Sequence, residues 1–105
     1  TAGTAAVMSV AVIDLNCDVA EGVGNEAGLM PWISSANLAC GAHAGDEATM
    51  REVAKLALHH GVAIGAHPGF ADREHFGRRE LTLSPDEIEA LVVTQVRALQ
   101  AIAPV

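Results

Sequence analysis

Three short apolar stretches in this chain each run directly into a group of polar, metal-binding or catalytic residues, and this repetition limits the folds open to it. The apolar stretches are Val10–Leu15, Ser35–Ala39 and Val62–Gly65. The groups that follow them are Asn16–Glu21, Cys40–Asp46 and Ala66–Phe70. In a parallel α/β sheet, ligands bind beyond the carboxyl ends of the strands. We therefore expect the three groups to meet in one composite site.

Length and composition favour one small domain that binds neither nucleic acid nor a membrane. The chain has 105 residues, half of them hydrophobic, but no apolar run is long enough to span a bilayer. Its net charge of −7, one Trp and two Phe provide neither a basic patch nor an aromatic platform for bases. Since the mean hydropathy is +0.30, the surplus of apolar side chains must pack inside or against a partner. We expect a cytoplasmic protein.

The N-terminal segment is expected to be a flexible lead over residues 1–9, with the domain over residues 10–105. The lead has neither a basic region nor an apolar core, so it does not resemble a signal peptide. Cys17 and Cys40 are too few for a disulfide scaffold and are not spaced as C-x-x-C. Two buried thiols in a reducing compartment are the favoured interpretation, and a metal-binding or nucleophilic role is the alternative.

Hydrophobic patterning predicts three strands, at Val10–Leu15, Ser34–Cys40 and Val62–Ala66. The segment Gly22–Trp32 contains three glycines and a proline, and is expected to be a loop that can include one irregular helical turn. Residues 67–83 are expected to form a long charged loop.

Two helices are predicted from their end signals. The first has Asp46 as its N-cap and Gly61 as its stop, and the second opens with Ser84-Pro85-Asp86-Glu87. The apolar residues expected to face the core are Met50, Val53, Ala54, Ala57 and Leu58 in the first helix and Ile88, Leu91, Val92, Leu99 and Ile102 in the second.

The order of these elements predicts an α/β fold with three parallel strands joined by right-handed crossovers. A complete (β/α)₈ barrel needs about 250 residues, so the chain is interpreted as the N-terminal part of a (β/α) barrel. Such a piece exposes sheet edges and apolar helix faces. Formation of a homo-oligomer or strand exchange is expected to cover them.

At the first predicted strand exit, alternation places Asp14, Asn16 and Asp18 on one face, and Glu21 follows closely. These groups suit a hard cation or general base catalysis. The alternative is that Asp14 and Asn16 only satisfy backbone groups at the strand end.

The second and third exits carry His43 and His67. Together with Asp18, these side chains are expected to gather around a common hollow and to suit a divalent ion with open positions. A structural role for each histidine is the alternative. Asp46 is expected to cap a helix, and the amide of Asn37 either points towards the site or pairs with the backbone.

The long loop contributes Asp72, Arg78 and Arg79. An arginine there is expected to hold a substrate carboxylate, because the planar guanidinium matches both oxygens, although a solvated charged loop is the alternative. No role is assigned to the histidines at 59, 60 and 75. The string G-V-G-N-E-A lies too far past the strand to bind a dinucleotide, and no P-loop is present.

Four strings occur in order along the chain: D-L-N-C-D-V-A-E-G, S-A-N-L-A-C-G-A-H-A-G-D, G-A-H-P-G-F and F-G-R-R. With these motifs the sequence resembles the LamB/YcsF family from about Ile13 to Leu99. The chain departs from the family at Ala20, where glycine is usual, at Ala42, where an aromatic residue is common, and at Ala71, where proline is common. Family members are about twice as long.

The resemblance implies a seven- or eight-stranded β/α barrel related to glycoside hydrolases and polysaccharide deacetylases. It also implies the A subunit of a 5-oxoprolinase that uses ATP with Mg²⁺ to open 5-oxo-L-proline to L-glutamate, in a complex with subunits B and C. The implied catalytic residues are Asp18, Glu21, Asp46 and His67. The implied substrate-binding residues are Asp14, Asn16, Asn37, Asp72, Arg78 and Arg79. A divalent metal would be bound by Asp18, His43 and His67, as in deacetylase-like relatives.

Two other functions fit parts of the pattern. The same cluster could hold a substrate or metabolite in a non-catalytic binding subunit. The strand exits taken alone also fit a metal-dependent carbohydrate deacetylase. A chain of this length could also be inactive by itself.

Overall fold

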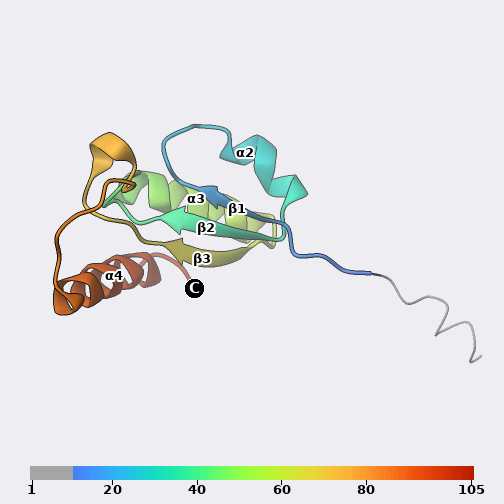
Figure 1. Ribbon diagram of the computed structural model, residues 1–105. Coiled ribbons are helices and arrows are strands. Elements are labelled where there is room, and N and C mark those ends of the chain that lie inside the picture. Colours follow the sequence, from blue (N-terminus) through green and yellow to red (C-terminus); the bar gives the residue numbers. More distant parts are fainter. Residues whose placement is uncertain (1–10) are drawn as a thin grey trace, which may run out of the picture.

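A three-stranded parallel sheet forms the centre of the molecule, with the strands in the order β1 (Asn16–Val19), β2 (Ser35–Ala39) and β3 (Ala63–His67). The computed structural model describes residues 11–105 (Figure 1). Helix α3 (Glu47–His59) connects β2 to β3 and covers one face of the sheet. The predicted α/β class with parallel strands and crossover helices is thus confirmed. The predicted lead over residues 1–9 lies outside the described residues.

The first strand was predicted at Val10–Leu15, which is wrong for the described residues 11–15. Strand β1 begins at Asn16, because its ladder partner Ser35 is the first residue of β2. The described residues 11–15 have no ladder partner, and Val12 and Ile13 are 92% and 80% exposed. Asn16 and Asp18 therefore lie within the strand rather than beyond its end.

Two regions predicted as loops contain short helical turns. Between β1 and β2, helix α2 (Glu26–Leu29) is followed at once by the 3₁₀ helix η1 (Met30–Trp32), so the segment holds two helical turns where the prediction was a loop with one irregular turn. After β3, the 3₁₀ helix η2 (Arg73–His75) interrupts the long charged segment. The other two predicted strands are confirmed to within one residue at each end.

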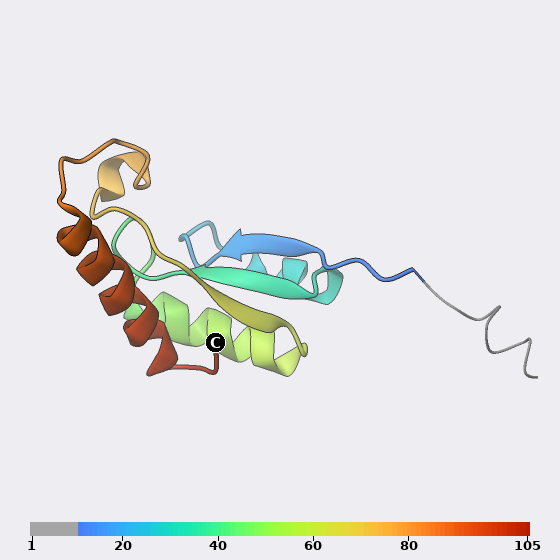
Figure 2. The same cartoon turned by 60° about the horizontal axis from the view of Figure 1, so that its bottom comes forward.

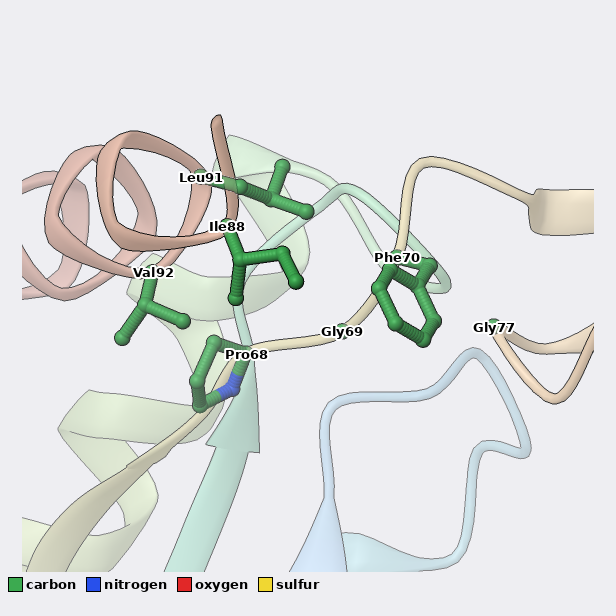
Figure 3. A pocket seen from close by; sticks show the side chains of 7 residues that line it. All are labelled: Pro68, Gly69, Phe70, Gly77, Ile88, Leu91 and Val92. Atoms are coloured by element: carbon green, nitrogen blue, oxygen red, sulfur yellow. The ribbon is translucent and has the colours of Figure 1, made fainter. Parts of the chain in front are cut away.

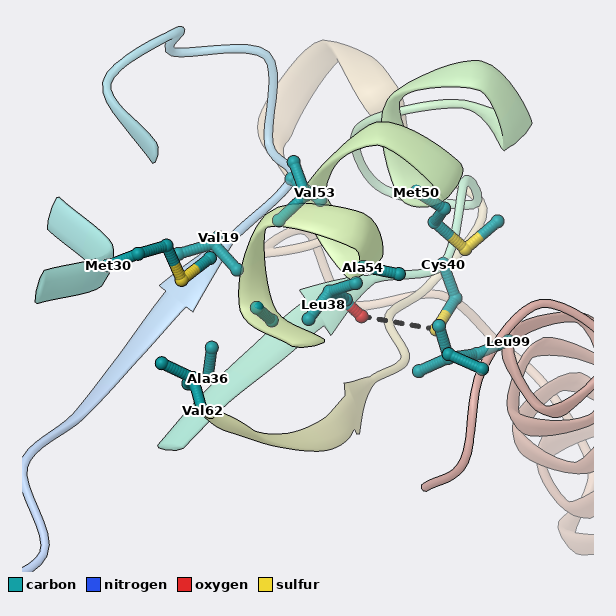
Figure 4. Close-up of a cluster of buried hydrophobic side chains, with 13 residues drawn as sticks. Val19, Met30, Ala36, Leu38, Cys40, Met50, Val53, Ala54, Val62 and Leu99 are labelled. Carbon is teal, nitrogen blue, oxygen red and sulfur yellow. Dashed lines mark hydrogen bonds between the residues drawn. The ribbon is translucent and has the colours of Figure 1, made fainter. Parts of the chain in front are cut away.

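Helix α3 supplies the main packing against the sheet. Its N-cap Asp46 accepts a hydrogen bond from the Thr49 amide at 2.7 Å, and Gly61 follows its last turn with φ +68°. The buried side chains that form the core between helix and sheet include Val19, Ala36, Leu38, Met50, Val53 and Ala54 (Figure 4). Ala57 belongs to the same cluster. The prediction for Leu58 is wrong, because this residue lies at the edge of the buried helix face, beside Ala54 and Ile102, and is 54% exposed.

Helix α4 (Pro85–Gln100) starts with the predicted capping box between Ser84 and Glu87 and lies beside β3 (Figure 2). Only its C-terminal part is well packed: Leu99 is fully buried, whereas Ile88 and Val92 are each 40% exposed. The predicted apolar face is therefore only partly used. Gln95 on the same helix is buried, which the pattern did not predict.

Among the described residues, none of the helices combines the length and the apolar character that crossing a bilayer requires.

Acidification is expected to weaken the N-terminus of α3. The Thr49 amide, and to a lesser extent Arg73, hold the pKa of Asp46 below its ordinary value of 3.8. A carboxyl group whose pKa is lowered by folding stabilises the folded state at pH values above its pKa in the unfolded chain. This stabilisation is lost as the pH falls through its pKa in the folded chain. Asp46→Ala should therefore be less stable than the parent chain at neutral pH, and the difference should shrink below about pH 4. Urea unfolding of the parent chain and of Asp46→Ala, repeated from neutral to acidic pH, measures the difference in their free energies of unfolding.

Asp46→Asn is the matched control, because asparagine also caps helices but does not titrate. A difference between parent and Asp46→Ala that stays constant from neutral to strongly acidic pH would contradict this account.

Candidate functional site

The three strand ends meet in a polar pocket of about 290 Å³. Its lining residues come from the segments that follow β1, β2 and β3 and from the loop beyond η2: Asp18, Glu21, His43, His67, Pro68, Gly69, Phe76, Gly77 and Arg78. The expected convergence of Asp18, His43 and His67 is therefore observed. The pocket also includes Glu21 and Arg78.

The central side chains approach one another without forming hydrogen bonds. Nε2 of His43 lies 3.6 Å from a carboxylate oxygen of Glu21, and Nδ1 of His67 lies 3.9 Å from the same oxygen and 3.8 Å from Asp18. The two imidazole rings meet edge to face, with centroids 4.6 Å apart. These separations are close to the roughly 3.4 Å that separates two ligand atoms on one tetrahedral ion with bonds near 2.1 Å.

Unpaired buried nitrogens identify the groups available to a ligand. Within the described part of the chain, both ring nitrogens of His43 and Nδ1 of His67 are buried and have no hydrogen-bond partner. Buried polar atoms rarely stay unpaired in proteins. One ligand atom each from Glu21, His43 and His67 lies within 4.8 Å of the others. The set that fits a divalent ion is thus Glu21, His43 and His67, while Asp18, half exposed, lies 3.8 Å from His67 and is not part of this set.

Burial is the main cause of the lowered pKa of His43, and the neighbouring His67 adds to it, while Glu21 acts in the opposite direction. The side chain of His43 is 2% exposed. A neutral imidazole keeps a lone pair that can bind a metal ion or accept a proton. The environment of His43 therefore favours the neutral imidazole, which can act as a metal ligand, over the imidazolium cation.

Close backbone contacts position this histidine and the adjacent carboxylate. Gly45 has φ +74°, and a Cβ at this position would overlap the carbonyl oxygen of Ala20, the residue before Glu21. Ala20 itself adopts φ +61° although it is not a glycine. A Cβ at Gly69 would overlap the ring of His43, and one at Gly77 would lie 2.8 Å from its Cβ. Glycine is needed at all three places for space, and at Gly45 and Gly77 also for the left-handed backbone conformation.

Arg73 connects η2 to the loop that carries His43, and the sequence pattern did not single it out. Its Nη1 donates to the carbonyl oxygens of Gly41 at 2.8 Å and Gly45 at 2.6 Å. An arginine in a charged loop looks like a solvated side chain in the sequence, so only its contacts identify its role.

Asp14, Asn16 and Asn37 form a hydrogen-bonded row on the sheet face opposite α3, and none of them lines the pocket. Asn16 donates to the Ser35 hydroxyl at 2.8 Å, and Asn37 donates to the side-chain oxygen of Asn16 at 3.4 Å. Hydrogen bonds from Ser34 and then Ser35 lower the pKa of Asp14. Asp14 and Asn16 lie towards the amino end of the sheet, whereas Asn37 lies in the middle of β2, opposite Asp18 in the ladder.

Asp72 and Arg79 are paired with each other outside the pocket. The Asp72 carboxylate is buried and lies 3.3 Å from Nε of Arg79 and 3.1 Å from the ring of His75. Of the two predicted arginines, only Arg78 lines the pocket. Asp46 caps α3 and is likewise absent from the pocket lining.

Both cysteines are free thiols, with Cys40 buried and Cys17 partly buried. Burial raises the pKa of Cys40. These features agree with the favoured interpretation of unreactive buried thiols.

The fold and the site define a parallel α/β protein whose polar side chains converge from successive strand ends. The chain belongs to the LamB/YcsF family, which it matches over residues 13–105.

The similar proteins described below are longer than this chain. It is 55% identical to the A subunit of a 5-oxoprolinase from Brevibacillus brevis and 54% identical to that from Staphylococcus carnosus, in each case over 85% of this chain and 37% of the relative. The solved structure of a lactam utilization protein from Thermus thermophilus superposes with a TM-score of 0.86 at 45% identity, covering 90% of this chain and 42% of that one. The chain thus spans less than half the length of these relatives.

Proposed function

We propose that this chain provides part of the active site of an ATP-dependent 5-oxoprolinase, which opens 5-oxo-L-proline to L-glutamate. The observation that carries the proposal is the convergence of Asp18, Glu21, His43 and His67 beside Arg78 in one pocket. The 55% identity to the A subunit of a 5-oxoprolinase supports this choice of substrate.

The chemistry requires activation of an unreactive amide. A five-membered lactam is resonance-stabilised and almost unstrained, so its opening is uphill unless it is coupled to ATP. Phosphorylation of the amide oxygen would make the carbonyl carbon electrophilic. Without a bound ion, either Asp18 or His67 would accept a proton from the attacking water, whereas with an ion held by His67 the half-exposed Asp18 would do so. His43, which is buried beside them, would stabilise charge that develops on the oxygen.

A divalent ion such as Zn²⁺ would be held by Glu21, His43 and His67. The donor set of two imidazoles and one carboxylate is typical of catalytic zinc, and the buried unpaired nitrogens fit such an ion. When bound, it would polarise a carbonyl or lower the pKa of a bound water.

The nucleotide and the partner proteins belong to the proposal as well. The chain has no P-loop, so ATP with Mg²⁺ would bind through a different kind of site. Association with 5-oxoprolinase subunits B and C, and between copies of this chain, would cover apolar surface such as Ile88 and Val92. The two free thiols suit a reducing compartment, and we place the reaction in the cytoplasm.

Arg78→Met tests the proposal on the substrate. The guanidinium is expected to hold the 5-oxoproline carboxylate, and loss of a charged hydrogen bond weakens binding roughly 10- to 100-fold. Calorimetry measures affinity for 5-oxo-L-proline, and 5-oxoproline-dependent ATP hydrolysis with subunits B and C measures KM. Arg97→Met, an exposed charge change on α4, is the matched control and should behave as the parent chain does.

Two outcomes would contradict the proposed enzymatic function. Unchanged binding and KM in Arg78→Met would remove the assigned role. Binding of 5-oxoproline without any dependent ATP hydrolysis in the assembled system would favour the non-catalytic binding subunit instead.

A further inference from the structure

Gln95 is a buried amide on the side of α4 that faces the strand end at His67. Its side chain is 5% exposed. Its Oε1 accepts from the Gly69 amide at 3.0 Å, and its Nε2 donates to the carbonyl oxygens of Gly69 at 2.8 Å and Leu91 at 3.1 Å. A single side chain thus pairs both backbone polar groups of Gly69.

Gly69 in turn lies against His43. A Cβ at position 69 would overlap Nδ1 of His43, so the glycine backbone lies directly on the imidazole ring. On another side, Gly77 approaches the Cβ of His43. A small shift of the Gly69 backbone would therefore either push the ring or leave space into which it can turn.

Side-chain packing between α4 and this segment is loose. An apolar pocket of about 290 Å³ separates Pro68, Gly69 and Phe70 from Ile88, Leu91 and Val92 of the helix (Figure 3). Because this space lies between them, the two segments are not fixed by close apolar contact at that point. The paired hydrogen bonds of Gln95 provide the direct connection.

We propose that Gln95 is a positioning residue that fixes the orientation of the His43 ring through Gly69, and thereby couples α4 to the pocket. Its importance for metal binding and catalysis rests on the proposed function, whereas its effect on the ring does not. Without the amide, the Gly69 N–H and C=O groups lose their partners, and the segment moves to reach water.

Gln95→Met tests the coupling, because methionine keeps the length of the side chain and loses all three hydrogen bonds. Nuclear Overhauser contacts between the Gly69 α protons and the His43 ring should be present in the parent chain and lost in the variant. The affinity for Zn²⁺ should fall about tenfold, at the lower end of the effect of residues behind metal ligands. Gln95→Glu keeps the acceptor for the Gly69 amide but loses both donations, so an intermediate result is expected. It carries the test if Gln95→Met does not fold.

Two further variants bracket the result. Gln100→Met makes the same change on the exposed side of α4 and should retain both the contacts and the affinity. Gly69→Ala displaces the ring directly and should weaken Zn²⁺ binding at least as much as Gln95→Met. All spectra are taken where circular dichroism shows each variant to be folded.

The outcomes separate this inference from the proposed function. Retained contacts in Gln95→Met, with Zn²⁺ affinity within twofold of the parent chain, would overturn the role of Gln95. If the parent chain binds no Zn²⁺, the metal assignment fails, and the contacts between Gly69 and His43 alone decide the role of Gln95.

Discussion

Replacing His43 with alanine is expected to lower the affinity of this chain for Zn²⁺ by about three orders of magnitude, the share of one ligand in a protein zinc site. His43 is buried, and both of its ring nitrogens lack hydrogen-bond partners among the described residues. The variant leaves only Glu21 and His67, a pair too small to bind zinc tightly. Competition with a chromogenic chelator measures the affinity, and the absorption spectrum of bound Co²⁺ reports the ligand geometry.

A double variant, His59→Ala with His60→Ala, is the matched control. These two histidines are exposed at the end of α3, where their rings form an adjacent pair that can bind metal weakly. The control should lose only weak sites and keep one tight site. Equal tight binding by the parent chain and by His43→Ala would show that the metal assignment is wrong.

Gly45→Ala is expected to destabilise the fold by about 2–5 kcal/mol. A left-handed backbone costs a non-glycine residue about 1–2 kcal/mol, and the overlap with the Ala20 carbonyl oxygen adds roughly 1–3 kcal/mol. That is a large share of the stability of a small domain. The added Cβ is fixed to one backbone segment, and the Ala20 carbonyl oxygen belongs to another. The overlap can therefore be relieved only by moving the end of β1 or the loop that carries His43. Chemical denaturation of the two chains measures the loss.

Gly61→Ala separates the two contributions. Gly61 also has a left-handed backbone, at φ +68°, but nothing lies within 4 Å of the Cβ that alanine would add. Only the conformational cost of about 1–2 kcal/mol is then expected. Equal losses in Gly45→Ala and Gly61→Ala would show that the contact with Ala20 contributes nothing.

Local signals were sufficient for most of the secondary structure. The Asp46 cap, the Gly61 stop and the box at Ser84 and Glu87 are short-range chemistry, and all of them are present as predicted. The first strand failed because pairing is non-local: an apolar run such as that before Asn16 becomes a strand only where a neighbour extends equally far. The predicted burial of Leu58 was wrong because the helical period of apolar residues does not show how far the sheet extends beneath the helix.

The site was predictable where the chain exits a strand and unpredictable where contacts are made by later loops. His43 and His67 follow from the strand pattern. That Glu21, rather than Asp18, is the carboxylate lying within 4 Å of both rings is seen only once the turn at Ala20 is known. Arg78 and Arg79 are equivalent in the sequence, and only the folded loop directs Arg79 to Asp72. Gln95 looks like one more polar helix residue until its hydrogen bonds to Gly69 are seen.

His67 lies opposite Ala39 in the ladder between β2 and β3, on the sheet face that also carries Asp18 and Asn37. A slip of one residue would turn the imidazole towards the helix layer and bring Ala66 into its place. A chain with formed helices but misaligned strands would then keep its helical circular dichroism and fail to capture zinc. Zinc binding would thus distinguish molecules with the correct strand register from compact misfolded ones.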